Sequence, residues 1–339
     1  MKEIKVAILG YGGIARAHMG GYNLLKKEGS PLRVVALCDI DPARFEQEVE
    51  INVDTAVAAE KNYNTYTDLD EMLSKEEIDM VDICLPTYLH KEYTVRMLRA
   101  GKHVQCEKPM ALSSADCAEM IATAKKCGKH LMIGQCLRFE APFLALKKAL
   151  DSGKYGRVLT ARFERLSTLP TWGHENWFVD FEKSGGEMMD MSIHDYDIAR
   201  YLFGEPKKVS AVTCDRQVRE QTSNGRLYYD DGMIVTVDGS WAESNSFPFS
   251  CPFRIVCENA TIAWPTMDSP VRVYPNEGEP YDLPKEPENY MANQSRYYAE
   301  VLLGERVNEK NPPESAMKTI ELIERLKESA AQDGAILTF

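Results

Sequence analysis

The segment GGEMMDMSIHDYD, residues 185–197, places two carboxylates and an imidazole at spacings that suit chemistry. On a helix Asp190 and His194 are four residues apart and share one face, and Asp197 follows three residues later on the same stripe. Three hypotheses fit this pattern: a metal site, a proton-transfer site, or a buried helix with polar partners. The other motifs of the chain have to distinguish them.

The segment VAILGYGGIARAH, residues 6–18, carries the pattern G-x-G-x-x-[GA] at Gly10, Gly12 and Ala15. Gly10 permits a tight turn, Gly12 lets the backbone approach a pyrophosphate, and Ala15 keeps the following helix close to the strand. The N–H groups at the start of that helix then face the phosphates. Because the pattern lies between a predicted strand and a predicted helix, it favours a dinucleotide cradle over a glycine turn in another α/β sheet.

Asp39 closes the next predicted strand, RVVALCD. A carboxylate at this place accepts hydrogen bonds from both ribose hydroxyls of an adenine dinucleotide. Its charge repels a 2′-phosphate, and no arginine follows directly, since Arg44 lies a turn into the next helix. We therefore expect NAD rather than NADP as the cofactor.

A second charged pair, Glu107 and Lys108, ends the predicted strand in HVQCEKPMALS. Ligands of parallel sheets bind at the carboxyl ends of the strands, and Pro109 fixes the exit of the chain. Lys108 is thus expected at the cofactor crevice, and so are Gln135 and Arg138 after the following strand. A solvated lysine paired with its neighbour Glu107 is the alternative that the residues alone leave open.

The first 136 residues alternate apolar segments with amphipathic helices. The segments are apolar almost throughout, as in a parallel sheet covered on both faces, and the helices within 88–101 and 113–128 close on glycine. This alternation predicts a doubly wound α/β domain, a Rossmann fold, over residues 1–136. The predicted strands lie at 5–10, 33–39, 80–86, 102–109 and 130–136.

From residue 137 the pattern changes. A helix over 139–150 is followed by successive strands, interrupted by the helix that contains Asp190, and two helices within 290–305 and 314–330 end the chain. This order predicts an α+β domain over 137–339, built on a large, mostly antiparallel open sheet. The predicted strands lie at 157–167, 208–218, 232–242, 253–264 and 270–275, and the Pro- and Glu-rich stretch 274–290 is expected to be an exposed loop.

The composition excludes several classes of protein. The 339 residues carry 40 Lys and Arg against 52 Asp and Glu, and the acidic surface that this implies repels phosphate backbones and anionic lipid headgroups. No apolar run approaches the roughly 20 residues of a membrane span. The nine cysteines are scattered without a C-x-x-C pair, as reduced thiols are. We expect a cytoplasmic protein that binds neither nucleic acid nor membrane.

Together these motifs resemble the glucose-fructose oxidoreductase, inositol dehydrogenase and MocA family. The resemblance covers residues 7–204, in the family's order and at family-like spacing, and the E-K-P triplet with a later D-x-x-x-H is a specific combination. The matching segments are GYGGIARAH with Asp39, LPTYLHKEY, CEKPMAL, GQCLRFEAPF, SGKYGRV and SGGEMMDMSIHDYDIARYLFG.

The resemblance implies a Rossmann domain, NAD(P)-dependent oxidation of a sugar or cyclitol hydroxyl, and a homodimer or homotetramer formed through the C-terminal sheet. By position, Lys108 matches the family's catalytic lysine, Asp190 its substrate-binding carboxylate and His194 its general base. The segment 85–90 matches the N-P-N-x-x-H loop along the cofactor. The expected cofactor contacts are Gly10, Tyr11, Gly12, Gly13, Ile14, Ala15, Asp39, Leu85, Pro86, Thr87, His90, Glu107, Lys108 and Gln135.

The chain also departs from the family pattern. Leu85 and Thr87 replace two asparagines, Glu187 replaces the third glycine of a G-G-G, and Phe178 stands where an arginine is common. We expect the chemistry to be retained and the substrate pocket to differ from those of familiar members.

Acid–base chemistry fits Asp190 and His194 best. Oxidation of a secondary alcohol by NAD requires loss of the hydroxyl proton as hydride leaves the same carbon, and histidine suits that proton transfer. Lys108 stabilises developing alkoxide charge, while Asp190 orients the substrate or the imidazole.

Metal binding by Asp190, His194 and Asp197 is the rejected alternative. A metal site needs further ligands, and His174, Glu175 and Asp180 nearby have no ligand spacing. The ammonium of Lys108 would also oppose a dication. We expect no metal.

The aromatic loop 168–186 precedes the Asp190 helix. Aromatic faces with scattered polar groups suit a polyhydroxylated ring, although aromatics that pack a long loop onto the sheet give the same sequence. The expected substrate contacts are Lys108, Arg138, Trp172, His174, Trp177, Asp190 and His194.

Two further functions remain open. One is a glycosidase or lyase that retains NAD and acts through transient oxidation, and the other is a non-catalytic NAD-binding sensor. The presence of Lys108, Asp190 and His194 argues against the sensor, because a binding protein has no need of a general base.

Overall fold

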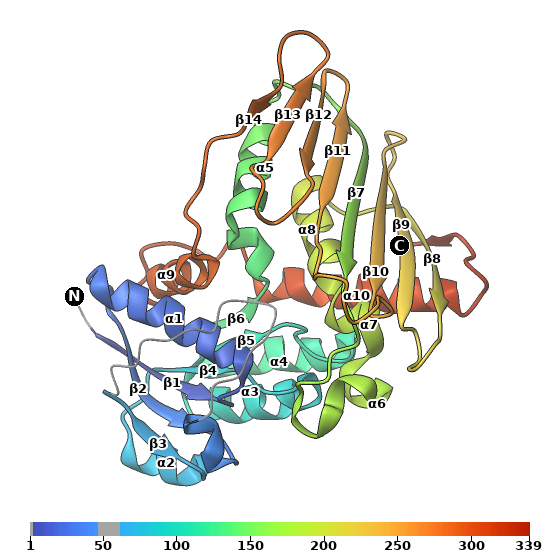
Figure 1. Cartoon of the computed structure of the whole chain (residues 1–339). Helices are drawn as coiled ribbons and strands as arrows, with labels where there is room; N and C mark the ends of the chain where they lie inside the picture. The colour runs from blue at the N-terminus through green and yellow to red at the C-terminus, as the bar shows by residue number, and fades with distance from the viewer. Residues whose placement is uncertain (1–2, 47–61) are drawn as a thin grey trace. The chain divides into compact units, whose positions relative to one another are not determined.

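The computed structural model describes residues 3–46 and 62–339, which form two compact units. Unit 1 comprises Met1–Phe139 and Asn289–Met317, and unit 2 comprises Glu140–Glu288 and Lys318–Phe339. Each unit is built on one sheet, and Figure 1 labels the elements of both.

Unit 1 contains a six-stranded sheet in which all neighbouring strands are parallel, in the order β3-β2-β1-β4-β5-β6. The strands β1, β4, β5 and β6 are buried almost throughout, which explains their near-continuous apolar sequences. The strands are β1 (Ile4–Leu9), β2 (Leu32–Cys38), β3 (Asn64–Tyr66), β4 (Met80–Ile83), β5 (His103–Glu107) and β6 (Leu131–Gly134).

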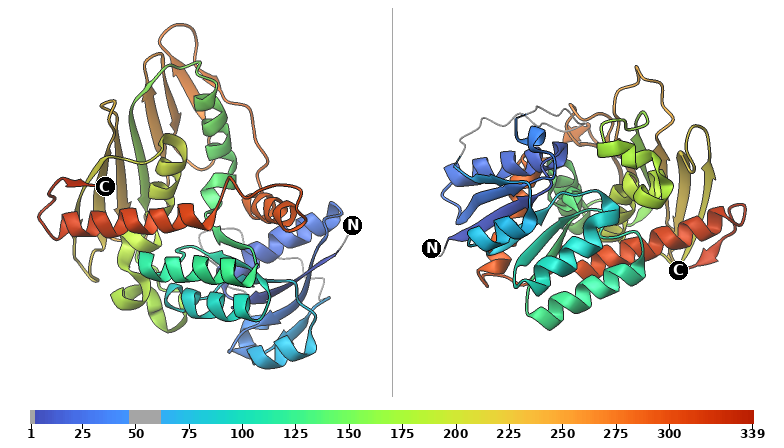
Figure 2. Two further views of the ribbon diagram at one scale, coloured as in Figure 1. Left: turned by 180° about the vertical axis from the view of Figure 1, so that it is seen from behind. Right: turned by 90° about the horizontal axis from the view of Figure 1, so that it is seen from below.

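Helices cover both faces of this sheet (Figures 1 and 2). The α4 helix begins where the Ser113 hydroxyl accepts the Asp116 N–H at 3.1 Å and ends at Gly128 in the left-handed conformation. The helices of unit 1 are α1 (Gly13–Lys27), α2 (Leu69–Lys75), α3 (His90–Arg99), α4 (Ser114–Cys127) and α9 (Tyr290–Leu302), with short 3-10 turns η1 (Pro42–Phe45), η2 (Thr87–Leu89) and η3 (Cys136–Phe139).

Unit 2 contains a nine-stranded sheet in the order β14-β13-β12-β11-β7-β10-β9-β8-β15, antiparallel except for the β7–β10 pair. The helices α5 and α8 lie together on one face of it (Figure 2). The strands are β7 (Val158–Leu166), β8 (Lys208–Cys214), β9 (Thr222–Tyr228), β10 (Ile234–Ser240), β11 (Phe253–Cys257), β12 (Ala260–Trp264), β13 (Arg272–Pro275), β14 (Tyr281–Asp282) and β15 (Leu337–Thr338).

The remaining helices come before or between these strands in the sequence. The α10 helix contains the boundary between the units, which falls after Met317. The bounds are α5 (Ala141–Asp151), η4 (His174–Val179), α6 (Phe181–Ser184), α7 (Gly186–Asp190), α8 (Ile193–Phe203) and α10 (Pro313–Ala330).

The predicted fold class, a Rossmann sheet followed by a mostly antiparallel sheet, is confirmed. The predicted division into residues 1–136 and 137–339 differs from the units in two respects: residues 137–139 and residues 289–317 both belong to unit 1. The second difference is the larger one. The reason lies in the contact of α9 with α1. A side-chain carbon at Gly21 would lie 2.9 Å from backbone atoms of Met291 and Ala292, so the two helices approach closely at this glycine.

Two expected helices also differ in detail. The helix expected over 139–150 begins at Ala141, because η3 still occupies residues up to Phe139. The segment 185–197, considered as one helix, is divided into α7 and α8 by Met191 and Ser192. Within the residues that the structure describes, no helix is both long and apolar enough to cross a membrane.

Candidate functional site

The turn between β1 and α1 has the geometry of a dinucleotide cradle. Gly10 has φ +84°, and a side-chain carbon there would lie 2.7 Å from the Cys84 carbonyl oxygen, so no other residue fits without strain. Gly12 is the N-cap of α1, and that helix has no side-chain cap. A side-chain carbon at Gly12 would meet nothing within 4 Å. The start of α1 therefore presents backbone N–H groups beside open space, which fits a pyrophosphate.

The other residues of this segment pack the cradle onto the sheet. Tyr11, Gly13 and Ala15 are buried, and Ile14 is half-buried. Ala15 is fully buried, as close contact between α1 and the sheet requires.

Asp39 is oriented by two backbone groups. Its Oδ2 accepts the Tyr11 N–H at 2.7 Å, and its Oδ1 accepts the Asp41 N–H at 2.9 Å. The carboxylate thus contacts the turn that contains the glycines, and each oxygen retains a second lone pair. Arg44, on η1, has its guanidinium 3.6 Å from the carboxylate of Asp41. The half-buried Asp39 carboxylate is placed to accept ribose hydroxyls at the end of β2.

The imidazole of His90 contacts backbone carbonyl groups that hold the segment 85–90 in place. Its Nδ1 lies 2.6 Å from the Pro109 carbonyl oxygen and its Nε2 lies 2.7 Å from the Leu85 carbonyl oxygen. Burial lowers the pKa of His90, and the two carbonyl oxygens oppose this. Thr87 is buried on η2, and Pro86 is the N-cap of that turn. His90 therefore links the loop after β4 to the turn after β5.

The turn after β5 contains Glu107 and Lys108. Glu107 is buried, and its Oε2 accepts the backbone N–H of Lys108 at 3.2 Å. Lys108 is half-buried, and its peptide bond to Pro109 is cis. The Glu107 carboxylate is therefore not solvated: it is buried and contacts the backbone.

Gln135 and Arg138 follow β6 but differ in their surroundings. The side-chain amide of Gln135 is buried, and none of its polar atoms has a hydrogen-bond partner among the described residues. An orphaned buried amide fits a polar ligand group such as a carboxamide. The Arg138 guanidinium is buried and donates to the Lys310 carbonyl and to the Ser315 hydroxyl, both at 2.8 Å. These bonds tie residues 289–317 to unit 1 and favour a structural role for Arg138.

The segment 184–200 of unit 2 is buried except at two positions. Asp190 ends α7, His194 lies in the first turn of α8, and these two side chains alone are half-exposed. The turn between them is compact, since the His194 N–H donates to the Met191 carbonyl at 3.4 Å. The structure thus brings a carboxylate and an imidazole to the accessible side of a buried segment, although not on one continuous helix.

Asp197, the third residue of the opening pattern, has a different environment. It is buried, and its Oδ1 accepts the Thr319 hydroxyl at 2.9 Å. A shared metal site with Asp190 and His194 is therefore disfavoured by the position of Asp197. Among the described residues, the one group of three His, Cys, Asp or Glu side chains with ligand atoms within 4.8 Å of one another is His18, Asp82 and Cys84.

Asp195 and Glu187 anchor the turn that carries Asp190 and His194. Asp195 is buried and accepts a bidentate pair of hydrogen bonds from Arg165 of β7, at 2.7 and 3.2 Å. Glu187 is also buried, and burial raises its pKa to about 8. These structural roles of Asp195 and Glu187 were not predicted from the sequence. A charged residue among apolar residues could have indicated them, because a buried charge needs a polar partner.

The aromatic residues before α6 form a stacked group. The Trp177 and Phe178 rings stack at 4.0 Å between centroids, and Phe178 meets the edge of the Trp241 ring at 6.4 Å. Trp172 and His174 are exposed. Trp177 and Phe178 therefore pack the loop onto unit 2, while Trp172 and His174 are accessible to a ligand.

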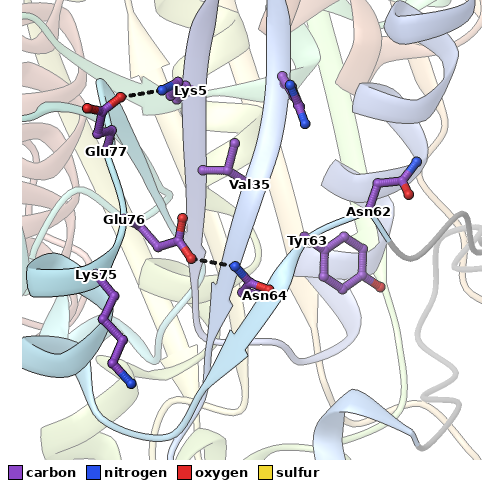
Figure 3. A pocket seen from close by; sticks show the side chains of 9 residues that line it. Lys5, Val35, Asn62, Tyr63, Asn64, Lys75, Glu76 and Glu77 are labelled. Atoms are coloured by element: carbon purple, nitrogen blue, oxygen red, sulfur yellow. Dashed lines mark hydrogen bonds and ion pairs between the residues drawn. The ribbon is translucent and has the colours of Figure 1, made fainter.

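A hollow in unit 1 contains none of the predicted site residues (Figure 3). It lies beside the edge strand β3, where Lys5 Nζ is 2.5 Å from Glu77 Oε2 and Asn64 Nδ2 donates to Glu76 Oε1 at 2.7 Å. These two pairs engage four of its polar side chains, and Arg33 and Lys75 pair with Glu3 and Glu71, so the hollow does not indicate a ligand site.

Comparison with known proteins gives two matching family models. Residues 4–135 match the oxidoreductase family with an NAD-binding Rossmann fold, and residues 143–263 match the GFO/IDH/MocA C-terminal domain. The two models together cover more than half of the chain.

Curated relatives and a solved structure agree with these models. The chain is 34% identical over 244 residues to D-glucoside 3-dehydrogenase of Escherichia coli (strain K12), across 70% of this chain and 65% of that relative. It is 29% identical over 236 residues to myo-inositol 2-dehydrogenase of Thermotoga maritima, across 69% and 64%. The matched stretch thus spans less than two thirds of either relative. The aldose-aldose oxidoreductase from Caulobacter crescentus, solved with glycerol, superposes over 100% of both chains with TM-score 0.82 and 25% identity.

Proposed function

Since the chain belongs to the Gfo/Idh/MocA family of oxidoreductases and unit 1 is an NAD-binding Rossmann domain, we propose that it transfers a hydride between a sugar or cyclitol secondary hydroxyl and NAD. The observation that carries the proposal is the exposure of Asp190 and His194 alone within the buried segment 184–200. If these two side chains only stabilised the fold, we would expect them to be buried like their neighbours.

The proposed cofactor is held by residues of unit 1. Gly10 permits the tight turn, Gly12 leaves room for the pyrophosphate, Asp39 accepts the ribose hydroxyls, and the orphaned amide of Gln135 binds the carboxamide. The bound nicotinamide supplies the hydride acceptor or donor. The charge of Asp39 disfavours a 2′-phosphate, so NAD is preferred to NADP.

Three side chains carry the proposed proton and charge chemistry. His194 removes the hydroxyl proton, Lys108 stabilises the negative charge that develops on that oxygen, and Asp190 hydrogen-bonds a neighbouring hydroxyl of the substrate. These roles follow the family positions of the E-K-P lysine and the D-x-x-x-H pair.

The substrate class is a polyhydroxylated ring. The relatives are named for a glucoside and for inositol, and the accessible Trp172 and His174 offer an aromatic face beside polar groups. We do not include Arg138 among the substrate contacts, because its guanidinium is engaged within unit 1.

Two further proposals concern the protein as a whole. The face of the unit 2 sheet opposite α5 and α8 carries polar strand residues, with Arg162 of β7 bridging Glu164 and Asp238 at 2.8 Å each, and we propose that this face forms a homodimer or homotetramer. All nine cysteines are free, which supports the cytoplasm as its compartment.

The test of the function is a panel of glucosides, free sugars and cyclitols with NAD and NADP, followed at the nicotinamide absorbance. Substrate-dependent NADH formation is expected. Glycoside cleavage with retained cofactor and no net NADH would replace the dehydrogenase with a glycosidase or lyase that acts through transient oxidation. Tight NAD binding without turnover of any compound would indicate a sensor.

A further inference from the structure

A cluster of polar side chains lies fully buried in unit 1, behind the turn that carries Lys108. His18 and Tyr22 come from α1, Asp82 from β4, and Gln105 and Glu107 from β5. All except Tyr22 and Glu107 have no exposed surface, and those two are 2% and 5% exposed. The proposed cofactor and substrate roles leave His18, Tyr22, Asp82 and Gln105 without a function.

His18 lies between two carboxylates. Its Nδ1 is 2.7 Å from Asp82 Oδ2, and its Nε2 is 2.9 Å from Glu107 Oε1. An ionised carboxylate only accepts hydrogen bonds, so between two ionised carboxylates both ring nitrogens donate and the imidazole carries a positive charge. Although burial disfavours that charge, Asp82 and Glu107 raise the pKa of His18 to about 10.

Neighbouring donors complete the shell of Asp82. The Tyr22 hydroxyl donates to Asp82 Oδ2 at 2.7 Å, and Gln105 Nε2 donates to Asp82 Oδ1 at 3.3 Å. The Cys84 thiol lies 3.9 Å from the same oxygen, and burial raises its pKa well above the ordinary value. A protonated thiol and a doubly hydrogen-bonded imidazolium make an ion-pair cluster rather than a metal site.

Glu107 is held in one conformation from three directions. His18 binds its Oε1, the Lys108 N–H binds its Oε2, and Gly134 of β6 leaves the space that Oε1 occupies. A side-chain carbon at Gly134 would lie 2.4 Å from Oε1, so the absence of a side chain there is required. On the other side of the turn, His90 contacts the Pro109 carbonyl oxygen.

From this arrangement we propose that His18, charged and held between Asp82 and Glu107, is a positioning residue that fixes the Lys108 turn through the Glu107 side chain. The inference rests on the proposed role of Lys108. Because His18 lies on the helix whose first turn forms the cradle, one rigid element determines the place of both the dinucleotide phosphates and the lysine.

A matched pair of substitutions separates the two halves of the histidine. In His18→Gln the amide nitrogen takes the place of Nε2 and still reaches Glu107, whereas in His18→Asn it takes the place of Nδ1 and reaches only Asp82. Both variants lose the charge. We expect kcat to fall by roughly 10- to 100-fold in His18→Asn, the scale of a small misplacement of a catalytic group, and by no more than about threefold in His18→Gln.

Two further readouts distinguish positioning from mere stability. The dissociation constant for NAD should be similar in the His18→Gln and His18→Asn variants, because the cradle itself is unchanged. The control variant His130→Asn, at an exposed histidine outside the cluster, should behave as the wild type. Equal loss of kcat in the Gln and Asn variants, or loss of NAD affinity in step with melting temperature, would overturn the proposal.

Nuclear magnetic resonance of ¹⁵N-histidine in the wild-type protein tests the charge without any variant or substrate. Both ring nitrogens of His18 should be protonated at pH 8, and a neutral ring at that pH would refute the proposal even if the variants do not fold. Failure of the dehydrogenase assay on every substrate would instead contradict the proposed function and leave this spectroscopic result standing.

Discussion

Glu187 of α7 reaches the sheet of unit 2, where its Oε2 accepts the Ser223 hydroxyl at 2.6 Å. Its other oxygen contacts the Ser192 hydroxyl and lies against Gly239 of β10, where a side-chain carbon would come within 2.1 Å of it. One carboxyl group thus joins two strands to the turn between Asp190 and His194. The residue that replaces the family's third glycine has a structural use in this chain.

Glu187 should make stability depend on pH in a predictable window. Burial raises its pKa from 4.5 to about 8, with Asp195 and Asp190 adding to the effect, so between these values the folded protein holds a proton that the unfolded chain has released. Stability contributed by this group therefore falls as pH rises through that window and levels above pH 8. The neutral Glu187→Gln should lack this decline.

Urea unfolding at pH 5.5 and pH 8.5 measures the effect. The variant should gain in free energy of unfolding relative to the wild type at the higher pH, while Glu182→Gln, at an exposed residue of α6, should follow the wild type. An unchanged difference between wild type and Glu187→Gln at the two pH values would show that Glu187 is ionised throughout.

Asp39 should determine the choice of cofactor. Asp39→Asn keeps one oxygen for the Tyr11 N–H but removes the charge, so NAD affinity should fall by ~1–3 kcal/mol and the preference over NADP should narrow. Isothermal titration with both cofactors measures this. Asp41→Asn is the control, because Asp41 caps η1 through the Ala43 N–H and has no proposed ribose contact. Tighter binding of NADP than of NAD by the wild type would contradict the assignment.

The chain's apolar segments were sufficient to predict most of the fold, but not which helix belongs with which sheet. The sequence of α9 shows an apolar face, and that face does not reveal that its partner is α1, because the pattern is the same for any apolar neighbour. The strand β9 was missed because its sequence, TSNGRLY, is polar apart from Leu227. Gly225 within it lies against the Tyr196 hydroxyl, a contact without a sequence signature.

The functional site, too, was only partly predictable from the sequence. The glycine turn is predictable because its backbone demands specific residues, and Gly10 has the conformation that the motif requires. The cluster around His18 was missed, although Asp82 is a charged residue inside the apolar run MVDICLP and therefore needed a buried partner. The partner lies 64 residues away on α1, and pairing across such a distance is fixed by the sheet order rather than by any local pattern.

Treatment with a metal chelator should leave the enzymatic activity unchanged. Asp197 is engaged with Thr319, and the ring nitrogens of His18 in the remaining candidate group face carboxylates, so neither set of side chains forms an open metal site. Dialysis against a strong chelator, followed by elemental analysis and assay, checks this. Stoichiometric zinc or manganese lost together with activity would reverse the assignment of Asp190 and His194 to acid–base work.

The different roles proposed for His194 and Lys108 can be tested by substituting each residue separately. His194→Ala should slow turnover by ~10²–10⁴, the usual effect of losing a positioned base, and part of the loss should be recovered at higher pH, where hydroxide replaces it. Lys108→Met should lower kcat by ~10²–10³ without comparable recovery, since it removes charge stabilisation rather than a base.

Both variants should still bind NAD, because the turn at Gly10 and Gly12 and the carboxylate of Asp39 are unchanged in them. The double variant should lose less than the sum of the two single losses in activation free energy, as groups that serve one proton transfer act as a unit. Steady-state kinetics across pH with a confirmed substrate measures all three. Near-normal turnover in either single variant would show that the E-K-P lysine or the D-x-x-x-H histidine does not have the role proposed, and strictly additive losses would show that the two groups act on separate steps.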